Sequence, residues 1–173
     1  TADIANGTGE QIWKAPETLE GSFPSTEGGT NLIWAKADRI AFVSFQDGWP
    51  HLYSIPSKGG KELLLSPGNY MVEHIKLSPD GNSLIFAANT GKDRFDLDRR
   101  HIGKVRIDQP GIEILTQGIG IESNPVFTGD QNTIAYLSST AQRPVLPAIM
   151  NSNGKSHRVL CEDLIPADFP QKQ

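Results

Sequence analysis

The densest group of side chains with chemical potential is the run from Asp93 to His101, which reads DRFDLDRRH. Carboxylates alternate at Asp96 and Asp98, as they do in calcium-binding loops, but the glycine and the closing glutamate of that motif are missing. We therefore expect no metal ion here. A dinucleotide cofactor is not expected either, because no Gly-rich turn leads from a strand into a helix.

Two arginines, Arg99 and Arg100, stand near the end of this run. A guanidinium group pairs well with a carbonyl or a carboxylate, because its N–H groups form a rigid fork. Acidic and basic side chains this close in sequence also pair with one another and hold their own segment together. The residue types alone leave both interpretations open.

A catalytic constellation is not recognisable in the sequence. In one large class of serine hydrolases the nucleophile lies in a Gly-x-Ser-x-Gly turn, and no such turn is present. We interpret the histidines as structural, because each falls within or beside an expected strand: His51, His74, His101 and His157. The Ser-Pro-Asp-Gly stretch at Ser78 consists of residues that tight turns select, so we expect a turn there.

Recurring strand-like runs must position these groups. A glycine followed by a short alternating run occurs four times, at intervals of 43 to 51 residues: Gly9, Gly60, Gly111 and Gly154. Longer segments between them end at three aromatic residues: Phe42, Phe86 and Tyr136. Each repeat unit contains four strand-like runs, joined by short connections rich in Gly, Pro, Asp and Asn.

Four-stranded antiparallel meanders that recur at this interval are typical of β-propeller blades. We predict an all-β, partial β-propeller with these parts: the outer part of a preceding blade at 1–23, blades at 28–68, 69–118 and 119–165, and an exit linker at 166–173. A β-sandwich would explain the alternation but not the recurring strand order. Trp34 shares a repeat position with Leu77 and Phe127, so we expect it to be buried between blades.

The number of blades is too small for a closed ring, since propellers usually have four to eight. Three blades and part of a fourth leave two apolar sheet faces without neighbours, which a monomer seldom tolerates. We therefore predict that the chain is a fragment. It either associates with a copy of itself or completes its ring with further blades.

Composition excludes several classes of partner. The chain has 173 residues, of which 37% are hydrophobic and 21% charged, as in an ordinary soluble domain. A net charge of −4 without a basic run argues against nucleic acid, and no apolar run is long enough to predict a membrane span. The first residues lack the order of a secretory signal. Cys161 is the single cysteine, so no intrachain disulfide is expected.

Four segments carry a resemblance to a known family: QDGWPHLYSIPSKGG from Gln46, VEHIKLSPDG from Val72, NTGKDRFDLDRRHIGKV from Asn89 and LIPADFP from Leu164. They resemble the propeller of bacterial prolyl oligopeptidase-family serine peptidases, of the dipeptidyl peptidase IV and acylaminoacyl-peptidase type. The resemblance covers nearly the whole chain. In that family the propeller precedes an α/β-hydrolase domain, and ADFP resembles the point where the chain leaves the last blade.

The resemblance implies that this chain is the non-catalytic part of a serine peptidase that cleaves short peptides, inactive by itself. The family's propeller covers the hydrolase site and can present acidic or arginine side chains to the substrate. The substrate-facing candidates are therefore Asp98, Arg99, Arg100 and, more weakly, Glu73. The family's double-glutamate anchor for an amino terminus is not visible, which leaves dipeptidyl specificity open. The resemblance also favours a periplasmic or other extracytoplasmic location.

A function from another class is the alternative. The chain would then be a stand-alone propeller-type module that binds a protein or peptide and has no hydrolase partner domain. A Gly-x-Ser-x-Gly turn within the next few hundred codons, or a stop codon, would separate the two interpretations.

Overall fold

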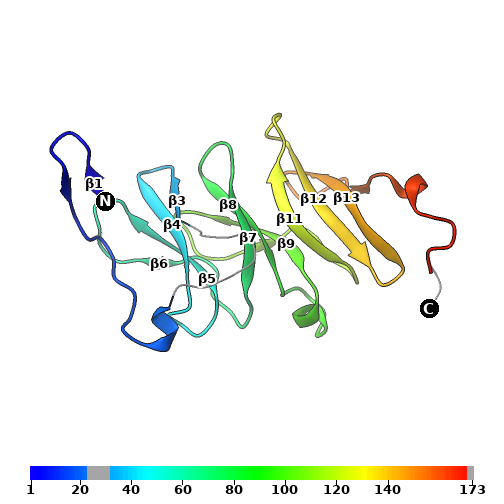
Figure 1. Ribbon diagram of the computed structural model, residues 1–173, viewed down its shortest axis with the longest axis horizontal. Helices are drawn as coiled ribbons and strands as arrows, with labels where there is room; N and C mark the ends of the chain where they lie inside the picture. The colour runs from blue at the N-terminus through cyan, green and yellow to red at the C-terminus, as the bar shows by residue number, and fades with distance from the viewer. Residues whose placement is uncertain (23–31, 171–173) are drawn as a thin grey trace.

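The computed structural model describes residues 1–22 and 32–170, and in that range the protein is all-β. It contains three four-stranded antiparallel sheets and one two-stranded hairpin. The three sheets stand side by side along the longest axis, with the hairpin near one end and the C-terminal segment at the other (Figure 1). The prediction of a partial propeller built from four-stranded meanders is confirmed. Within the described residues the sheets do not close into a ring.

The strands of each sheet follow one another in space as they do in the chain. The first sheet comprises β3 (Leu32–Ala35), β4 (Arg39–Ser44), β5 (His51–Pro56) and β6 (Leu63–Leu64). The second comprises β7 (Val72–Leu77), β8 (Ser83–Ala88), β9 (His101–Arg106) and β10 (Glu113–Ile114). The third comprises β11 (Ile121–Phe127), β12 (Thr133–Thr140), β13 (Arg143–Asn151) and β14 (Arg158–Val159).

The remaining elements are short. They are the hairpin strands β1 (Ala2–Asp3) and β2 (Thr8–Gly9) and three single turns of 3-10 helix, η1 (Leu19–Gly21), η2 (Asp96–Asp98) and η3 (Glu162–Leu164). The predicted start of the first blade at residue 28 lies outside the described residues. So do residue 23 and residues 171–173, the ends of the predicted N-terminal part and of the exit linker.

The Ser-Pro-Asp-Gly stretch is a turn between β7 and β8, as predicted. The Gly81 N–H donates to the Ser78 carbonyl at 2.8 Å, and the Ser78 hydroxyl donates to Asp80 Oδ1 at 2.5 Å. These bonds stabilise the carboxylate, so the hydroxyl of Ser78 and the groups of Asn82 lower the pKa of Asp80 to about 2. The serine is therefore a turn residue and not a nucleophile.

Each sheet has two faces, and we name them by the direction of the chain. The upstream face looks toward the preceding part of the chain and the downstream face toward the following part. At the first junction, Ala41 and Val43 on the downstream face of the first sheet share a buried cluster with Leu84 and Phe86 on the upstream face of the second. The large, fully buried side chains of Leu84 and Phe86 each contribute about 1.5 to 3 kcal/mol to the free energy of folding.

The second junction repeats this arrangement. Ile85 and Ala87, on the downstream face of the second sheet, share a cluster with Ile134 and Tyr136 on the upstream face of the third. Because successive residues of a strand point to opposite faces, β8 supplies both junctions, and every one of its residues is buried. The second sheet is therefore the centre of the molecule.

Trp34 corrects one expectation, because its side chain is 60% exposed. Its repeat position is the one predicted, and in that position Leu77 and Phe127 pack on the clusters of the two junctions. The upstream face of the first sheet meets no complete sheet among the described residues. In the part of the chain that the structure describes, it packs against Ile12 and Trp13 of the N-terminal segment. The repeat position thus predicted correctly on which face of the sheet Trp34 lies, but it did not predict whether another sheet packs on that face.

Within residues 1–22 no strand forms beyond the β1–β2 hairpin. Ile12 and Trp13 pack on the first sheet, and the ring centroids of Trp13 and Phe42 lie 4.7 Å apart. A strand needs a hydrogen-bonded neighbour, and the described residues offer none at this place. That this segment is the outer part of a preceding blade stays a prediction.

Candidate functional site

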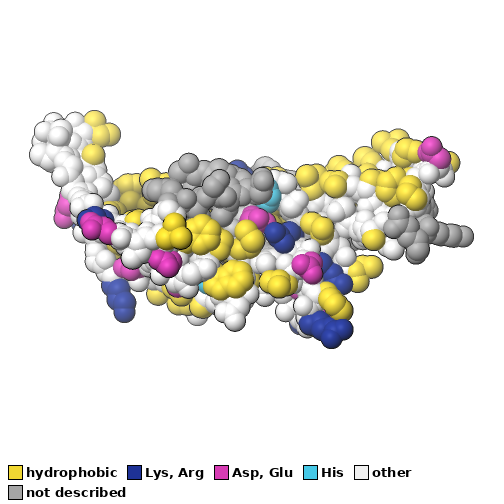
Figure 2. Space-filling view, turned by 60° about the horizontal axis from the view of Figure 1, so that its bottom comes forward, with side chains coloured by type: hydrophobic (Ala, Val, Ile, Leu, Met, Phe, Trp, Pro, Cys, Tyr) yellow, Lys and Arg dark blue, Asp and Glu magenta, His cyan; other side chains and the backbone are white. Residues whose placement is uncertain are grey.

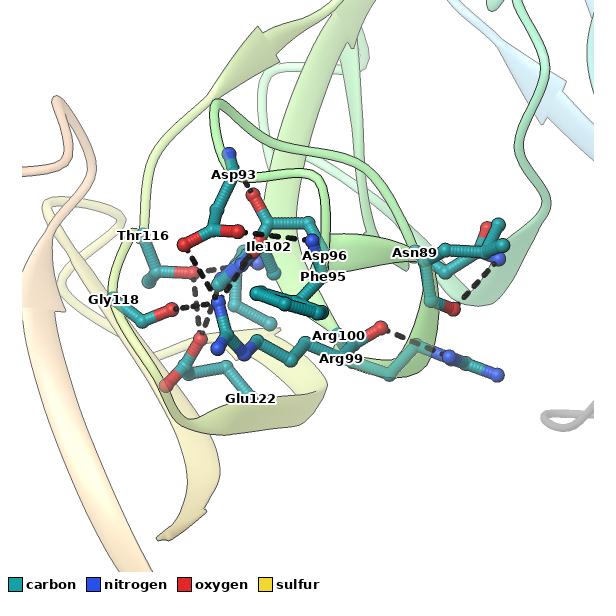
Figure 3. Close-up of polar contacts among 12 residues, drawn as sticks. Asn89, Asp93, Phe95, Asp96, Arg99, Arg100, Ile102, Thr116, Gly118 and Glu122 are labelled. Atoms are coloured by element: carbon teal, nitrogen blue, oxygen red, sulfur yellow. Dashed lines mark hydrogen bonds and ion pairs between the residues drawn. The ribbon is translucent and has the colours of Figure 1, made fainter.

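The connection between β8 and β9, residues 89–100, is longer than the corresponding connections of the other sheets, at 45–50 and 141–142. We call it the rim loop, because the three connections lie along one edge of the molecule, the lower edge in Figure 1. Three of the four substrate-facing candidates, Asp98, Arg99 and Arg100, lie in it. Figure 3 shows its polar contacts.

Asp96 anchors the rim loop from within. Its buried carboxylate accepts the Asp93 N–H at 2.8 Å and the Arg99 Nη1 at 3.1 Å, and it lies 3.1 Å from His101 Nε2. Burial alone raises the pKa of Asp96, but the hydrogen bonds from Asp93, His101 and Arg99 outweigh it and hold the pKa below its ordinary value. The loop is thus wrapped around an ionised carboxylate.

His101, the first residue of β9, joins this carboxylate to the third sheet. Its ring is buried, and its Nδ1 lies 3.0 Å from Oε2 of Glu122 on β11. The hydrogen bond to Glu122 and the one to Asp96 raise the pKa of His101, against the opposing effect of burial. Thr116 Oγ1 also donates to Glu122, at 3.2 Å. The His101 ring therefore bridges the Asp96 carboxylate of the rim loop and the Glu122 carboxylate of the third sheet.

Arg99 closes the loop on its outer side. Besides Asp96, its Nη1 approaches Asp93 Oδ2 at 3.5 Å and the Gly118 carbonyl at 3.4 Å (Figure 3). These contacts are the acidic and basic pairing that the sequence left open as one of two interpretations. The Arg99 side chain remains 19% exposed, so part of its guanidinium reaches solvent.

The structure brings two further candidates together. Arg100 Nε donates to Glu73 Oε2 at 2.5 Å, and Arg100 Nη1 donates to the Arg99 carbonyl at 2.9 Å. Glu73 is buried on β7, whereas 26% of the Arg100 side chain is exposed. The fourth candidate, Asp98, is exposed and has no ion pair among the described residues. The structure therefore pairs Arg100 with Glu73 and brings Arg100 to the Arg99 backbone, and it gives Asp98 no ion pair with any other candidate among the described residues.

Most of the chain matches one protein family. Residues 8–145 match the model described as the dipeptidyl peptidase IV (DPP IV) N-terminal region. The chain belongs to this family. No curated protein matches the chain in sequence.

Solved structures share the fold of this DPP IV N-terminal region. Porphyromonas gingivalis dipeptidyl peptidase 4 matches 78% of the chain with a TM-score of 0.63 and 20% identity, over 18% of its own length. A putative dipeptidyl aminopeptidase IV from Bacteroides ovatus matches 76% with a TM-score of 0.59 and 17% identity, over 21% of its length. A putative TolB from Agrobacterium tumefaciens matches 74% with a TM-score of 0.58 and 20% identity. The chain spans 47% of that TolB, so it corresponds to less than half of each of these proteins.

The rim loop of this DPP IV N-terminal region presents two apolar side chains. Phe95 and Leu97 flank the buried Asp96 and are 50% and 55% exposed. The guanidinium carbon of Arg94 lies 4.5 Å from the centre of the Phe95 ring, within cation–π distance. The anchored carboxylate thus turns an aromatic, an aliphatic and a basic side chain outward.

Two further histidines make structural contacts, His51 and His157. His51 Nδ1 lies 2.6 Å from Asp47 Oδ2, and the His157 ring lies 3.2 Å from the Tyr136 hydroxyl. None of these contacts pairs a histidine with a serine nucleophile. In residues 1–22 and 32–170 no group of three or more His, Cys, Asp or Glu could hold a metal ion. No helix in the same ranges has the length and apolar character to cross a bilayer.

Sequence reasoning missed three important residues of the rim loop and its anchor, Phe95, Leu97 and Glu122, and it did not foresee that Asp96 is buried as the anchor. The usual rule places apolar side chains inside and carboxylates outside, and the loop reverses it. The signal that was available is Asp96 next to two arginines and a histidine. Glu122 gave no signal, because its contact with His101 depends on how two sheets meet.

Proposed function

We propose that this chain is the non-catalytic propeller part of a serine peptidase that cleaves short peptides. In this proposal the rim loop gates or positions the peptide for an α/β-hydrolase domain of the same protein. Membership of the DPP IV N-terminal region family supports the peptidase context. The gating role is supported by the geometry of the loop itself.

The observation that carries the proposal is the ionic anchor under exposed apolar side chains. Asp96, His101 and Glu122 fix the base of the loop to two sheets, while Phe95 and Leu97 stay exposed. Such an anchor is unnecessary for a connection that only reverses the chain, as the short turn at 141–142 does. A side chain held in place in advance loses less conformational entropy when a ligand binds, which favours recognition.

The polar candidates take different parts in this proposal. Asp98 is exposed and can pair with the amino terminus of a peptide, and the exposed parts of Arg99 and Arg100 can pair with its carbonyl groups. Glu73 is engaged by Arg100 and acts by holding that guanidinium in position.

The test uses the complete peptidase that contains this region. Phe95→Ala should lower kcat/KM for short peptide substrates about fivefold, because an exposed aromatic anchor contributes about 1 kcal/mol or more to binding. Ile4→Ala is the matched control, since Ile4 is equally apolar and is exposed in the β1–β2 hairpin. Unchanged kcat/KM in Phe95→Ala, and also in Arg99→Ala and Arg100→Ala, would refute the role of the loop.

A second candidate function is a stand-alone module that binds a protein or peptide. It is favoured by the likeness to TolB, which is close in TM-score to the likeness to the peptidases. The purified chain should hydrolyse no chromogenic dipeptide in either case, and activity would contradict both. The coding sequence after Gln173 separates them, because only the first proposal requires a hydrolase nucleophile turn there.

A further inference from the structure

The attachment of the rim loop depends on how many protons the His101 ring carries. The ring lies between two carboxylates, with Nε2 3.1 Å from Asp96 Oδ1 in the loop and Nδ1 3.0 Å from Glu122 Oε2 on β11. A carboxylate has no proton to donate, so both contacts are hydrogen bonds only when both ring nitrogens carry a proton. A neutral ring has one N–H and can therefore bind one of the two carboxylates but not both.

The charges around the ring favour its protonated form. The side chains of His101, Asp96 and Glu122 are 1%, 5% and 9% exposed, so all three groups are withdrawn from water. Arg99 gives one positive charge to Asp96. On the side of the third sheet lies Tyr136, whose phenol stays neutral because burial and the charge of Glu122 raise its pKa. An imidazolium is therefore needed to balance the second buried carboxylate.

Among the described residues, Glu122 has fewer other donors than Asp96. Apart from the ring, Glu122 accepts the Thr116 hydroxyl at 3.2 Å. Asp96 accepts two further donors, the Asp93 N–H at 2.8 Å and Arg99 Nη1 at 3.1 Å. The single proton of a neutral ring is therefore better placed on Nδ1, facing Glu122. The lone pair of Nε2 then faces Asp96 Oδ1, and two acceptors at 3.1 Å repel each other.

The contact that fails on deprotonation holds the rim loop to the body of the protein. The other bonds of Asp96 lie within the loop, so they persist when the carboxylate moves away from the ring. The contact of Arg99 Nη1 with the Gly118 carbonyl is long, at 3.4 Å, and holds the loop only weakly. Phe95 and Leu97 are about half exposed. Figure 2, in which the lower edge of Figure 1 is turned forward, shows hydrophobic and basic side chains together on this edge.

We propose that protonation of His101 controls whether the rim loop is held against the junction of the second and third sheets. The imidazolium holds the loop, and loss of one proton releases it together with its exposed apolar side chains. The pKa of His101 is raised, first by the hydrogen bond to Glu122, so the loop is held below the ordinary histidine value of 6.5 and is released as pH rises through the folded-state pKa. The proposal concerns the conformation of the loop and does not depend on its proposed role with peptides.

Hydrogen exchange in the complete protein that contains this region tests the proposal. Mass spectrometry of peptides from residues 89–100 gives a protection factor, in which the measured exchange rate is divided into the intrinsic rate at the same pH. Protection of the rim loop should fall about tenfold between about pH 6 and about pH 9, because a charge-assisted hydrogen bond is lost. Peptides from β8 should keep their protection over this range. Protection of the loop that stays constant or rises with pH would overturn the proposal.

Two histidine variants assign the effect to one ring. His101→Gln keeps an amide at the site but does not titrate, so protection of the rim loop should already be low at about pH 6 and should not change with pH. His51→Gln is the matched control, because His51 begins the third strand of the first sheet and contacts Asp47 instead of the rim loop. It should leave the response of the loop intact. A response that persists in His101→Gln would assign it to another group and refute the proposal, and the series on the unmodified protein decides by itself if that variant does not fold.

Discussion

His51 and His101 begin the third strand of neighbouring sheets and have the same backbone surroundings. The residue after each histidine makes the same bond: the Leu52 N–H donates to the Ser66 hydroxyl at 2.8 Å. The Ile102 N–H donates to the Thr116 hydroxyl, also at 2.8 Å. The residue before each histidine also makes the same bond to the following sheet. The Pro50 carbonyl accepts the Val72 N–H at 3.0 Å, and the Arg100 carbonyl accepts the Glu122 N–H at 2.8 Å. The repeat thus reproduces the frame of the histidine.

The two side chains nevertheless have different neighbours. His51 packs edge-on against Tyr70, with ring centroids 5.4 Å apart, whereas His101 lies against Glu122. The repeat position of Tyr70 is Gly120 in the next unit, and a Cβ on Gly120 would lie only 2.5 Å from Glu122 Oε1. A glycine therefore makes room for a carboxylate. Where the second sheet's repeat unit has the ring of Tyr70, the third has Gly120, and the carboxylate of Glu122 occupies the space that this leaves. His101 thereby gains a carboxylate partner, and the pair anchors the rim loop.

The largest expected difference comes from removing each ring. His101→Leu leaves Asp96 and Glu122 buried without their common donor, and breaking a buried ionic group in this way costs about 3 to 5 kcal/mol. His51→Leu should cost about 1 to 2 kcal/mol, because the Asp47 side chain is 31% exposed and water can solvate it. Urea unfolding of the two variants measures both free energies. Equal losses would remove the distinction between the two sites.

A pH series sharpens the same comparison. The pKa of His101 is raised, first by the hydrogen bond to Glu122, so its ionic contribution to stability is complete below the unfolded-state pKa and is lost as pH rises through the folded-state pKa. The stability gap between the unmodified chain and His101→Gln should therefore be widest near about pH 6 and narrow toward alkaline pH. His51→Gln provides the reference series. A gap for His101→Gln that widens with pH would contradict an ionised anchor.

The smallest expected effects come from neutralising the partners. Glu122→Gln keeps a hydrogen-bonding group beside His101 but removes its charge, so it should cost about 1 kcal/mol and lower the pKa of His101. Asp47→Asn should cost about 0.5 kcal/mol, because the amide can still hydrogen-bond to the His51 ring and the Asp47 side chain is 31% exposed to water. An NMR titration of the His101 ring reads the first variant directly. A ring pKa unaffected by Glu122→Gln would mean that Asp96 alone sets it.

The fold was readable from the sequence because its signals are local. Alternation of apolar residues and turn residues such as Pro79, Asp80 and Gly81 identify strands and reversals without knowledge of tertiary contacts. Trp34 marks the limit of this reasoning. Its face follows from strand phase, but its burial depends on whether another sheet packs on that face, which the repeat does not state.

The candidate site was only partly readable. Pairing of Arg99 with Asp93 and Asp96 joins residues a few positions apart, and the sequence offered it as one interpretation. The contact of His101 with Glu122 joins residues 21 positions apart across a junction, which residue types cannot foretell. Phe95 also escaped notice, because its exposure results from the burial of the neighbouring carboxylate.

Complete burial of β8 has a dynamic consequence. In an array where each sheet contacts only its neighbours, local opening is cheapest at a sheet with a free face and most costly at one covered on both sides. The amides of Ser83–Ala88 should therefore exchange last with deuterated solvent, after those of β4 and β12. The rim loop follows that strand directly in the chain. Its exposed aromatic side chain, Phe95, is therefore attached to the strand that we expect to open least often.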